Sequence, residues 1–487
     1  MMNKLFNSRS AYEDSSTLGY ELLPFNFDKI NNKYILTNIV GDSLFLDFDN
    51  LNQLIQHQLS PSSSIYNSLK AKFFIFDNTN KDGALNLLSL RYRTKNYQKS
   101  FFTSLHMFVV SLRCDHSCPY CQVSRQNIKT NKFDMSKEIA DKGIDFVFKS
   151  PNPLIKIEFQ GGESMLNFNL IKYITQEVKS KNELYNKNIQ FVIATNLSFL
   201  DDEILDFCKL NNIFISTSLD GPKELHNKNR PNPGNNSYQN TKKAIKKAQD
   251  RLGIDKVSAI MTTTEDSLRE PIEIINEYID SNFNSIFLRP LSPYGFAIKT
   301  KTYDKYKTKE WLDFYKKGLN YILDLNKNGI FFTEFYASII LTKILTPYDF
   351  GYVDLQSPTG AGISAIVFNY DGNVYSSDEA RMLAEMGDDT FNIGNLLKDD
   401  YKKIMTHPTL LSSIEDSITV SSPMCNECAF IEYCGSDPTY HHATQKDFTG
   451  FKPLSGFCEK NMEIAKYLFQ LMENEENKKI LYNWLNI

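Results

Sequence analysis

Two groups of cysteines account for seven of the eight cysteines in this chain of 487 residues. The first group has the spacing C-x3-C-x2-C and consists of Cys114, Cys118 and Cys121. The second has the spacing C-x2-C-x5-C with a distant fourth member and consists of Cys425, Cys428, Cys434 and Cys458. In a reducing compartment, thiols clustered in this way bind metals or do chemistry more often than they form disulfides. The isolated Cys208 lies on an apolar helical face and is expected to be core.

The first group leaves a metal shell incomplete. Three thiolates on one short loop can hold three corners of an iron-sulfur cubane and leave its fourth iron open to another ligand. A structural zinc site takes four ligands, usually from two paired C-x2-C elements. His116 is a candidate for a fourth zinc ligand, but it would have to reach back from inside the loop between two cysteines. The spacing therefore favours a cluster with one open iron.

The second group can close a shell by itself. Four thiolates saturate a four-coordinate zinc ion and equally well the four irons of a 4Fe-4S cluster. The spacing alone leaves both metals open. It does predict a saturated site, in contrast to the first group.

From about residue 104 onward, short apolar runs alternate with amphipathic stretches of helical length, a pattern typical of a parallel β/α array. The expected strands are 107–112, 155–159, 190–195, 213–218, 256–261 and 285–289. Helices are expected at 136–149, capped by Ser136, and at 237–250. Six such units predict an α/β fold, a partial or open (β/α)6 barrel whose reactive groups gather at the C-terminal ends of the strands.

The rest of the chain follows other patterns. The first hundred residues predict a β-hairpin, a helix, a Ser/Pro turn, a second helix and a closing strand, an order that suits a small winged-helix-like module. After residue 300 we expect a helical segment, then a hairpin that turns at Asp371 and Gly372, and a last helix from about residue 459. The expected domains are 1–100, 101–325 and 326–487.

Charge and hydropathy exclude some classes of partner. The 54 basic and 58 acidic residues give a formal net charge of -4, so no overall basic field predicts nucleic acid or anionic lipid as a partner. No run approaches the roughly 18 apolar residues of a membrane span, and the N-terminal stretch lacks the apolar core of a signal peptide. We expect a cytoplasmic protein.

The cysteine loop CDHSCPYC resembles the signature of the radical S-adenosylmethionine (radical SAM) enzymes, including the aromatic residue before its last cysteine, here Tyr120. In that family the open iron of a 4Fe-4S cluster binds the amino and carboxylate groups of SAM. Reductive cleavage then yields a 5'-deoxyadenosyl radical, which abstracts a hydrogen atom from the substrate. The resemblance implies an enzyme that carries a 4Fe-4S cluster, binds SAM and needs a one-electron reductant of the flavodoxin or ferredoxin type.

Further motifs stand after successive expected strands. A pair of glycines lets the backbone approach a ligand closely, and Gly161, Gly162 and Glu163 resemble the family's GGE motif. The motif implies that Glu163 is the charged partner of the SAM ammonium group. Arg230 is expected to pair with the SAM carboxylate. By the same resemblance the remaining SAM contacts are Thr195, Asn196, Ser218 and Asp220.

The second cysteine group resembles the SPASM domain of radical SAM peptide maturases and implies an auxiliary 4Fe-4S cluster. A full SPASM domain holds one more cluster, but Ser377 and Pro438 stand where two of its cysteines are expected, and the run SPTGAG has none. We therefore expect two 4Fe-4S clusters in all. Asp378 matches a carboxylate that lies at the substrate and can act as a base, although a turn acid would fit equally well. Gln160 is a second candidate for the substrate pocket.

The N-terminal module resembles elements that bind the leader of a ribosomally made precursor peptide as an added strand. Most of the chain resembles the His-Xaa-Ser system maturases, called HxsB. The resemblance implies a maturase that modifies a precursor peptide, beside other proteins of the same system. Two alternatives stay open. One is a sulfatase-type maturase that oxidises Ser or Cys to formylglycine, disfavoured because Gln122 and Val123 stand where a tyrosine is expected. The other is a non-catalytic, zinc-stabilised peptide-binding scaffold.

Overall fold

The computed structural model describes residues 19–79, 81–349 and 351–487. Residues 1–18, part of the N-terminal stretch in which no signal-peptide core is expected, lie outside the described residues. The chain divides into two compact units. The first unit comprises residues 1–97, 342–349 and 423–433, and the second comprises 98–341, 350–422 and 434–487.

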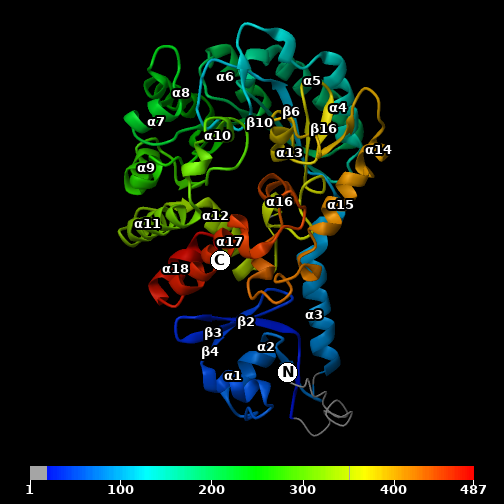
Figure 1. Ribbon diagram of the computed structural model, residues 1–487, viewed down its shortest axis with the longest axis vertical. Helices are drawn as coiled ribbons and strands as arrows, with labels where there is room; N and C mark the ends of the chain where they lie inside the picture. The colour runs from blue at the N-terminus through cyan, green and yellow to red at the C-terminus, as the bar shows by residue number, and fades with distance from the viewer. Residues whose placement is uncertain (1–18, 80, 350) are drawn as a thin grey trace. The chain divides into compact units, whose positions relative to one another are not determined.

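The second unit is built on an eight-stranded sheet with the strand order β12-β11-β10-β9-β6-β15-β16-β17 (Figure 1). Its strands are β6 (Leu105–Ser111), β9 (Leu154–Gly161), β10 (Asn188–Ala194), β11 (Ile213–Ser218), β12 (Val257–Ile260), β15 (Ala365–Phe368), β16 (Asn373–Tyr375) and β17 (Asn392–Asn395). The five strands from β12 to β6 pair in parallel. Each of these five lies within two residues of its expected position, so the parallel-rich α/β fold is confirmed.

The sixth expected strand does not join this sheet. Only Ser285–Ile286 forms a strand there, β13, and it pairs with β14 (Thr333–Glu334) in a separate two-stranded sheet. Beyond it Pro290 offers no N–H to continue a ladder. The backbone N–H of Thr263 donates to the carbonyl of Arg289 at 3.0 Å and holds this segment beside the end of β12.

The hairpin expected near Asp371 is present, but its place in the sheet was not predicted. It consists of β15 and β16, turns at Gly372 with φ +87°, and joins the outer edge of β6. β15 runs parallel to β6, with Val367 beside Met107 and Phe368 beside Phe108. The hairpin therefore extends the sheet of the expected barrel.

Helices follow the strands in the alternating order that the sequence predicted. The larger ones are α4 (Lys137–Lys149), α5 (Phe168–Tyr185), α6 (Asp202–Asn211), α8 (Ser237–Leu252), α9 (Pro271–Ile279), α11 (Thr308–Lys327) and α17 (Gly456–Leu471). Ser136 caps α4, because its Oγ accepts a hydrogen bond from the N–H of Ile139 at 3.3 Å. At Gly143 an added Cβ would lie 2.6 Å from the ring of Phe108, so α4 packs closely on β6. Cys208 is fully buried in α6, as expected.

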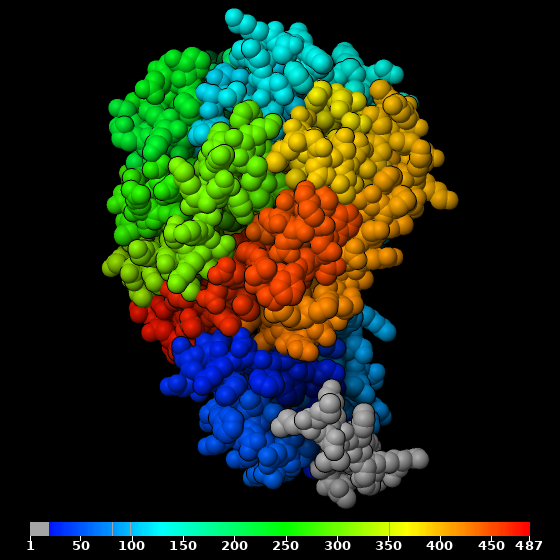
Figure 2. Space-filling model, in the orientation of Figure 1, coloured from blue at the N-terminus to red at the C-terminus, as the bar shows by residue number. Residues whose placement is uncertain are grey.

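Shorter helices close the face of the second unit that Figure 2 shows. In that view the segment around α10 (Phe296–Lys299), in light green, meets the yellow hairpin and α13 (Asp378–Ala384), and side chains cover the sheet behind them. A further short helix, α16 (Pro438–Gln445), is capped by Asp437, whose Oδ1 accepts from the N–H of Tyr440 at 2.9 Å. No helix among the described residues is both long enough and apolar enough to cross a bilayer.

The first unit follows the order of elements expected for residues 1–100. It contains β1 (Glu21–Leu22), β2 (Phe25–Ile30), β3 (Lys33–Asn38), β4 (Ser43–Leu46), α1 (Phe48–Ile55), α2 (Ser64–Ala71), β5 (Ile75–Phe76) and α3 (Lys81–Asn96). β2, β3 and β4 form an antiparallel sheet, and β1 pairs with β5. The hydroxyl of Thr37 donates to the carbonyl of Ala429 at 2.6 Å, so residues from the second cysteine group's own run pack within this unit. That the unit is a winged-helix-like module stays a prediction.

The core under the cysteine loop depends on aromatic packing across three strands. Phe108 is fully buried, and its ring centroid lies 5.0 Å from that of Phe368 and 6.3 Å from that of Phe159. Phe108→Ala should reduce the free energy of unfolding by about 3 to 5 kcal/mol, because it leaves a cavity in this layer. Urea unfolding followed by circular dichroism measures the effect. Leu154→Ala, at a site 59% exposed on neighbouring β9, is the control. Equal losses in the two variants would contradict the assignment of this core.

Candidate functional site

The separate sequence motifs meet in one cavity of about 430 Å³ in the second unit. Four strands of the sheet, β9, β10, β11 and β12, bring their C-terminal ends to it, and the cysteine loop that follows β6 lines it as well. Twelve of the expected site residues line it, namely Cys114, Cys118, Tyr120, Cys121, Gln160, Gly161, Gly162, Thr195, Asn196, Ser218, Arg230 and Asp378. Of the expected residues in this unit's barrel, Glu163 and Asp220 are not part of the lining.

Contacts at both ends hold the cysteine loop in place. At its start, the guanidinium of Arg113 makes two hydrogen bonds of 2.8 Å to Asp134 and one of 2.9 Å to the carbonyl of Leu166. At its end, the carbonyl of Cys121 accepts from the N–H of Phe296 at 2.7 Å. Gly295, which the sequence reasoning missed, permits this approach, because an added Cβ would lie 2.6 Å from that carbonyl. Its φ of +61° is a further reason for glycine.

The glycine pair has a physical reason that differs from the expected one. An added Cβ at Gly161 would lie 1.8 Å from the carbonyl oxygen of Ser111, and one at Gly162 would lie 2.4 Å from that of Arg113. The N–H of Gly162 donates to Ser111 at 2.8 Å. The two glycines thus let the end of β9 lie against the chain that enters the cysteine loop. Both glycines also line the cavity, and their close approach to a ligand stays a prediction.

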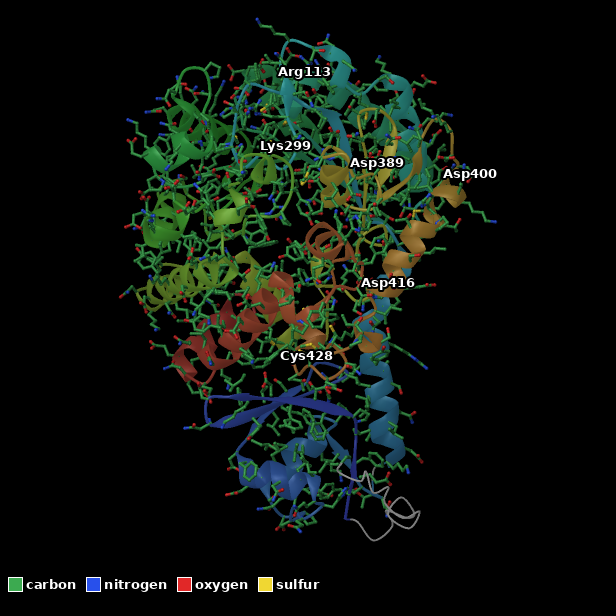
Figure 3. All side chains as sticks on the ribbon, in the orientation of Figure 1. Arg113, Lys299, Asp389, Asp400, Asp416 and Cys428 are labelled. Atoms are coloured by element: carbon green, nitrogen blue, oxygen red, sulfur yellow. The ribbon has the colours of Figure 1, made fainter. Side chains whose placement is uncertain are left out.

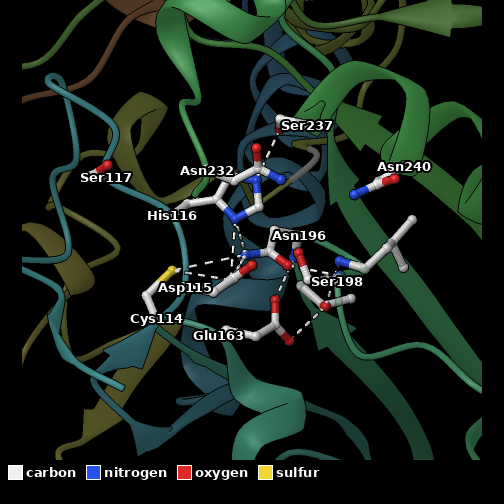
Figure 4. A network of polar contacts seen from close by, with 12 residues as sticks. Cys114, Asp115, His116, Ser117, Glu163, Asn196, Ser198, Asn232, Ser237 and Asn240 are labelled. Atoms are coloured by element: carbon white, nitrogen blue, oxygen red, sulfur yellow. Dashed lines mark hydrogen bonds and ion pairs between the residues drawn. The ribbon is translucent and has the colours of Figure 1, made fainter. Parts of the chain in front are cut away.

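Glu163 lies behind the cavity wall and organises the loop after β10 (Figure 4). It is fully buried, and its carboxylate accepts from the hydroxyl of Thr195 at 2.7 Å and from the N–H of Asn196 at 2.7 Å. Burial raises the pKa of Glu163 to about 7, and these hydrogen bonds oppose the rise. Glu163 therefore positions two residues that do line the cavity.

Burial also changes the pKa values of the cysteine thiols. It raises the pKa of Cys114 well above its usual value and that of Cys118 to about 12, so both thiols are neutral without a cation beside them. A bound metal reverses this, because thiolate is the ligand form. Three thiols on one cavity wall fit a cluster that leaves room for another ligand.

His116 does not complete a metal shell with the three thiols. Its Nε2 is 2.9 Å from the hydroxyl of Ser237, and its Nδ1 is 3.1 Å from Asp115 and 2.8 Å from the amide of Asn196 (Figure 4). Cys114, Asp115 and His116 do present ligand atoms within 4.8 Å of one another. Both imidazole nitrogens are nevertheless engaged, so this trio would have to break hydrogen bonds before it could hold an ion.

Arg230 is held at the cavity by a buried chain of hydrogen bonds. The hydroxyl of Tyr120 donates to Asp220 at 2.5 Å, and the guanidinium of Arg230 donates to the oxygen of Tyr120 at 2.8 Å. Burial raises the pKa of the Asp220 carboxyl, an effect that the Arg230 charge opposes. Asp220 thus stands behind the lining and supports a cation that faces the cavity.

Asp378 reaches the cavity from the hairpin side. It opens α13, which Ser377 caps by accepting from the N–H of Ala380 at 3.1 Å. Its carboxylate accepts from Nε of Arg381 at 3.0 Å, and Arg381 also donates to the carbonyl of Val123 at 3.3 Å. Arg381, at 1% exposure, therefore ties the candidate base to the end of the cysteine loop.

A second, smaller cavity of about 80 Å³ adjoins the first, and the sequence reasoning missed it. Both cavities are lined by Phe287, Arg289, Tyr352, Asp354 and Glu379. Asp437 and Lys460 line the smaller one as well. Some of its charged residues are close in sequence to predicted site residues, as Glu379 is to Asp378. Only the fold brings these charged residues together in one cavity.

The second cysteine group divides between the two units. Cys425 and Cys428 belong to the first, where the N–H of Cys428 donates to the carbonyl of Cys425 at 3.1 Å. Cys434 and Cys458 belong to the second, with Cys458 in the first turn of α17. A shared site for the four thiols stays a prediction.

The two histidines after Cys434 have structural partners. Nε2 of His441 is 2.9 Å from the hydroxyl of Ser455, and Nε2 of His442 is 2.9 Å from the carboxylate of Asp388. Burial lowers the pKa of His441 to about 4, so its ring is neutral at pH 7. These contacts give both histidines structural partners.

Comparison with known proteins supports the resemblance. Residues 108–278 match the model of the Radical SAM superfamily, so the chain carries a radical SAM domain. An uncharacterized protein of Methanocaldococcus jannaschii is 39% identical over 113 residues, which span 23% of this chain and 37% of that protein. A cysteine-type anaerobic sulfatase-maturating enzyme of Clostridium perfringens is 23% identical over 77% of this chain and 98% of its own length. The radical SAM cyclopropyl synthase TigE of Paramaledivibacter caminithermalis is 23% identical over 65% of this chain and 59% of its own.

Solved structures share the fold. The anSMEcpe enzyme with bound AdoMet superposes with a TM-score of 0.64 and 19% identity over 77% of this chain and 99% of its own. Streptococcus suis SuiB bound to its precursor peptide SuiA superposes with a TM-score of 0.52 and 13% identity over 89% of this chain and 98% of its own.

The glycine contact predicts a defect in cluster assembly. Gly161→Ala should prevent the normal seating of the cysteine loop, because the new Cβ would overlap the Ser111 carbonyl. We expect a severalfold loss of bound iron after anaerobic reconstitution, measured by iron and sulfide analysis. Gly83→Ala, where an added Cβ meets nothing within 4 Å, is the control. Wild-type iron content in Gly161→Ala would contradict this role for the glycine.

Proposed function

We propose that this radical SAM enzyme modifies a ribosomally made precursor peptide by abstracting a hydrogen atom from one of its residues. The observation that carries the proposal is the single cavity that brings the three cysteines, Arg230 and Asp378 together from four strand ends and a hairpin. The names of the similar proteins support a peptide as the substrate. They include sulfatase-maturating enzymes, anSMEcpe with a bound peptide, and SuiB with its precursor peptide.

The cavity residues have different proposed roles, according to their charge and position. Cys114, Cys118 and Cys121 would hold a 4Fe-4S cluster, and its open position would face the rest of the lining. When bound, the cluster and SAM supply the 5'-deoxyadenosyl radical. Arg230, fixed by Tyr120, is the cation available to a SAM carboxylate.

Other lining groups would bind the rest of SAM. Glu163 holds the Asn196 backbone and the Thr195 hydroxyl in place at the end of β10. Ser218 ends β11 and lines the same cavity. These groups offer hydrogen bonds to the ammonium and ribose of SAM.

The substrate would lie between this wall and the hairpin. Asp378, which opens α13 after the hairpin, lines the cavity beside the further carboxyl groups of Asp354 and Glu379, and Gln160 lines it from β9. In the proposed mechanism Asp378 accepts a proton from the substrate radical while an electron leaves. Arg381 keeps the Asp378 carboxylate in position by donating a hydrogen bond to it.

An auxiliary 4Fe-4S cluster at Cys425, Cys428, Cys434 and Cys458 completes the proposal. It would accept the electron that remains when the substrate radical is quenched, and a flavodoxin- or ferredoxin-type reductant would supply the first electron. The first unit would bind the leader of the peptide as a winged-helix-like module, in the manner of the His-Xaa-Ser system maturases. Other proteins of that system would be partners, and the enzyme would act in the cytoplasm.

A second candidate is the oxidation of Ser or Cys to formylglycine. The similarity to sulfatase-maturating enzymes over most of the chain favours it. Gln122 and Val123, in place of the expected tyrosine, disfavour it. Mass spectrometry of a co-expressed precursor peptide separates the two, because formylglycine has a defined mass and reacts as an aldehyde.

Cleavage of SAM tests the enzymatic reading directly. With dithionite, the reconstituted protein should release 5'-deoxyadenosine, and Cys118→Ala should abolish the release because the cluster loses a ligand. Liquid chromatography measures the product. Cys208→Ala, at a buried thiol of α6 outside the cavity, should retain it. Zinc in place of iron, with no 5'-deoxyadenosine from the wild type, would leave the binding scaffold as the better description.

The role of Asp378 predicts a separation of two activities. Asp378→Asn should still release 5'-deoxyadenosine, but modification of the peptide should fall by about 100-fold, in the range of a lost acid or base catalyst. The two are measured together by chromatography and mass spectrometry of the co-expressed peptide. Asp389→Asn, at an exposed aspartate shortly after α13 (Figure 3), is the matched control. Full modification by Asp378→Asn would exclude this residue as the base.

A further inference from the structure

The smaller cavity, hereafter the side cavity, has walls of aromatic rings. They belong to Phe287, Tyr294, Tyr303, Tyr306, Trp311, Tyr336, Tyr352, Tyr440 and Phe457. Residues that line both the side cavity and the larger cavity, among them Arg289 and Glu379, lie where the two cavities meet. A peptide that lies in the larger cavity could therefore place one side chain in the side cavity.

The side cavity also gathers five ionisable groups of both signs. Arg289 and Lys460 face Asp354, Glu379 and Asp437, so the carboxylates outnumber the cations by one. Nη2 of Arg289 is 4.0 Å from Glu379, and Lys460 lies over the rings of Tyr336 and Phe457 at 5.2 and 5.3 Å. Burial, and then the charge of Asp354, raise the pKa values of Glu379 and Asp437. A ligand group that donates a hydrogen bond would stabilise these neighbouring carboxylates.

Two buried donors in the wall have no partner among the described residues. They are the hydroxyl of Tyr294 and the indole N–H of Trp311, and each residue is 1% exposed. A buried polar group without a partner is unfavourable, and an indole N–H can only donate. These two groups point to a ligand that carries a hydrogen-bond acceptor.

We propose that the side cavity binds one side chain of the peptide substrate, and that this side chain is a small planar group which both donates and accepts hydrogen bonds, an imidazole or a primary carboxamide. Its acceptor would meet Trp311 and Tyr294, and its donor would meet the carboxylates. The inference rests on the proposed function for the peptide that brings the side chain. The binding chemistry rests on the side cavity alone.

Other kinds of side chain would pair with only some of the donors and carboxylates of the side cavity. An aliphatic group leaves both the donors and the carboxylates unpaired. A carboxylate accepts from Trp311, but it would lie among three carboxyl groups whose pKa values burial already raises, and it offers them no donor. An ammonium group offers no acceptor to the indole. With a volume of about 80 Å³, the side cavity has room for a small planar group.

The two tryptophans of the chain provide a direct probe. The full-length, cluster-reconstituted protein in its oxidised state is labelled with 15N-tryptophan, which gives two indole signals, from Trp311 and Trp484. Trp484→Phe assigns them. Nε1 of Trp484 already donates to Asn326 at 3.3 Å, so its signal serves as an internal reference. Imidazole, acetamide, acetate and methylammonium are titrated separately at constant ionic strength.

We expect a saturable downfield shift of the Trp311 indole proton with imidazole or with acetamide, and the tighter of the two identifies the side chain. Tyr294→Phe should weaken this binding at least fivefold, whereas Tyr467→Phe, whose hydroxyl donates to Asn320 instead, should not. Asp437→Asn should also weaken it, and asparagine keeps the cap of α16.

Three results would overturn the inference. They are no saturable shift with either probe, tighter binding of acetate or methylammonium, and equal binding by Tyr294→Phe and wild type. Release of 5'-deoxyadenosine is measured on the same samples. A protein that cleaves SAM but binds neither probe refutes the side-cavity inference alone, whereas one that binds a probe but does not cleave SAM refutes the proposed function.

Discussion

The structure of the site depends on the position of β6 between two parallel neighbours. β9 pairs with one edge of β6 as far as Ser111, and β15 pairs with the other edge at Leu105 to Phe108. The pairing with β9 brings the glycine pair against the backbone at Ser111 and Arg113. The pairing with β15 brings the hairpin, and with it Asp378, to the same cavity as the cysteines. Both outcomes follow from backbone hydrogen bonds between paired strands, and these bonds do not depend on which side chains the strands carry.

Buried charges then give the cavity its chemistry. Glu163 and Asp220 lie behind the cavity wall. The carboxylate of each accepts a hydrogen bond from a residue that lines the cavity. Arg381 likewise holds Asp378 by a hydrogen bond while it contacts the cysteine loop. These hydrogen bonds stabilise the buried ionic groups, although Oδ1 of Asp220 and Nη2 of Arg381 have no partner among the described residues. The pattern is one of lining residues fixed by a second layer of charged partners.

The side cavity shows the opposite situation. There charged residues of both signs line one cavity, and two donors in the wall lack partners among the described residues. Its aromatic walls come from segments as far apart in sequence as Phe287 and Phe457. A surface of this kind is suited to a ligand that supplies the missing hydrogen bonds.

The parallel strands and the residues at their ends were predictable because each depends on a local pattern. β-branched and apolar runs marked five strands to within two residues, and the C-x3-C-x2-C loop and the GGE run each followed one of them. The cap at Ser136 and the turn at Gly372 were predictable for the same reason, since caps and tight turns are set by a few neighbouring residues.

The failures concern contacts between residues distant in sequence. The run 285–289 has the composition of a strand, but a strand forms only where a partner offers a free edge, and Ser285–Ile286 pairs with β14 outside the main sheet. A second reason for Gly161 was missed, because the atom that an added Cβ would meet is the carbonyl oxygen of Ser111, fifty residues earlier. By itself the sequence determined the chemistry available to this protein: its thiols, their spacing and the strands that carry them. Only the tertiary structure decided which groups share a cavity, because backbone pairing across long separations cannot be read from local side-chain patterns.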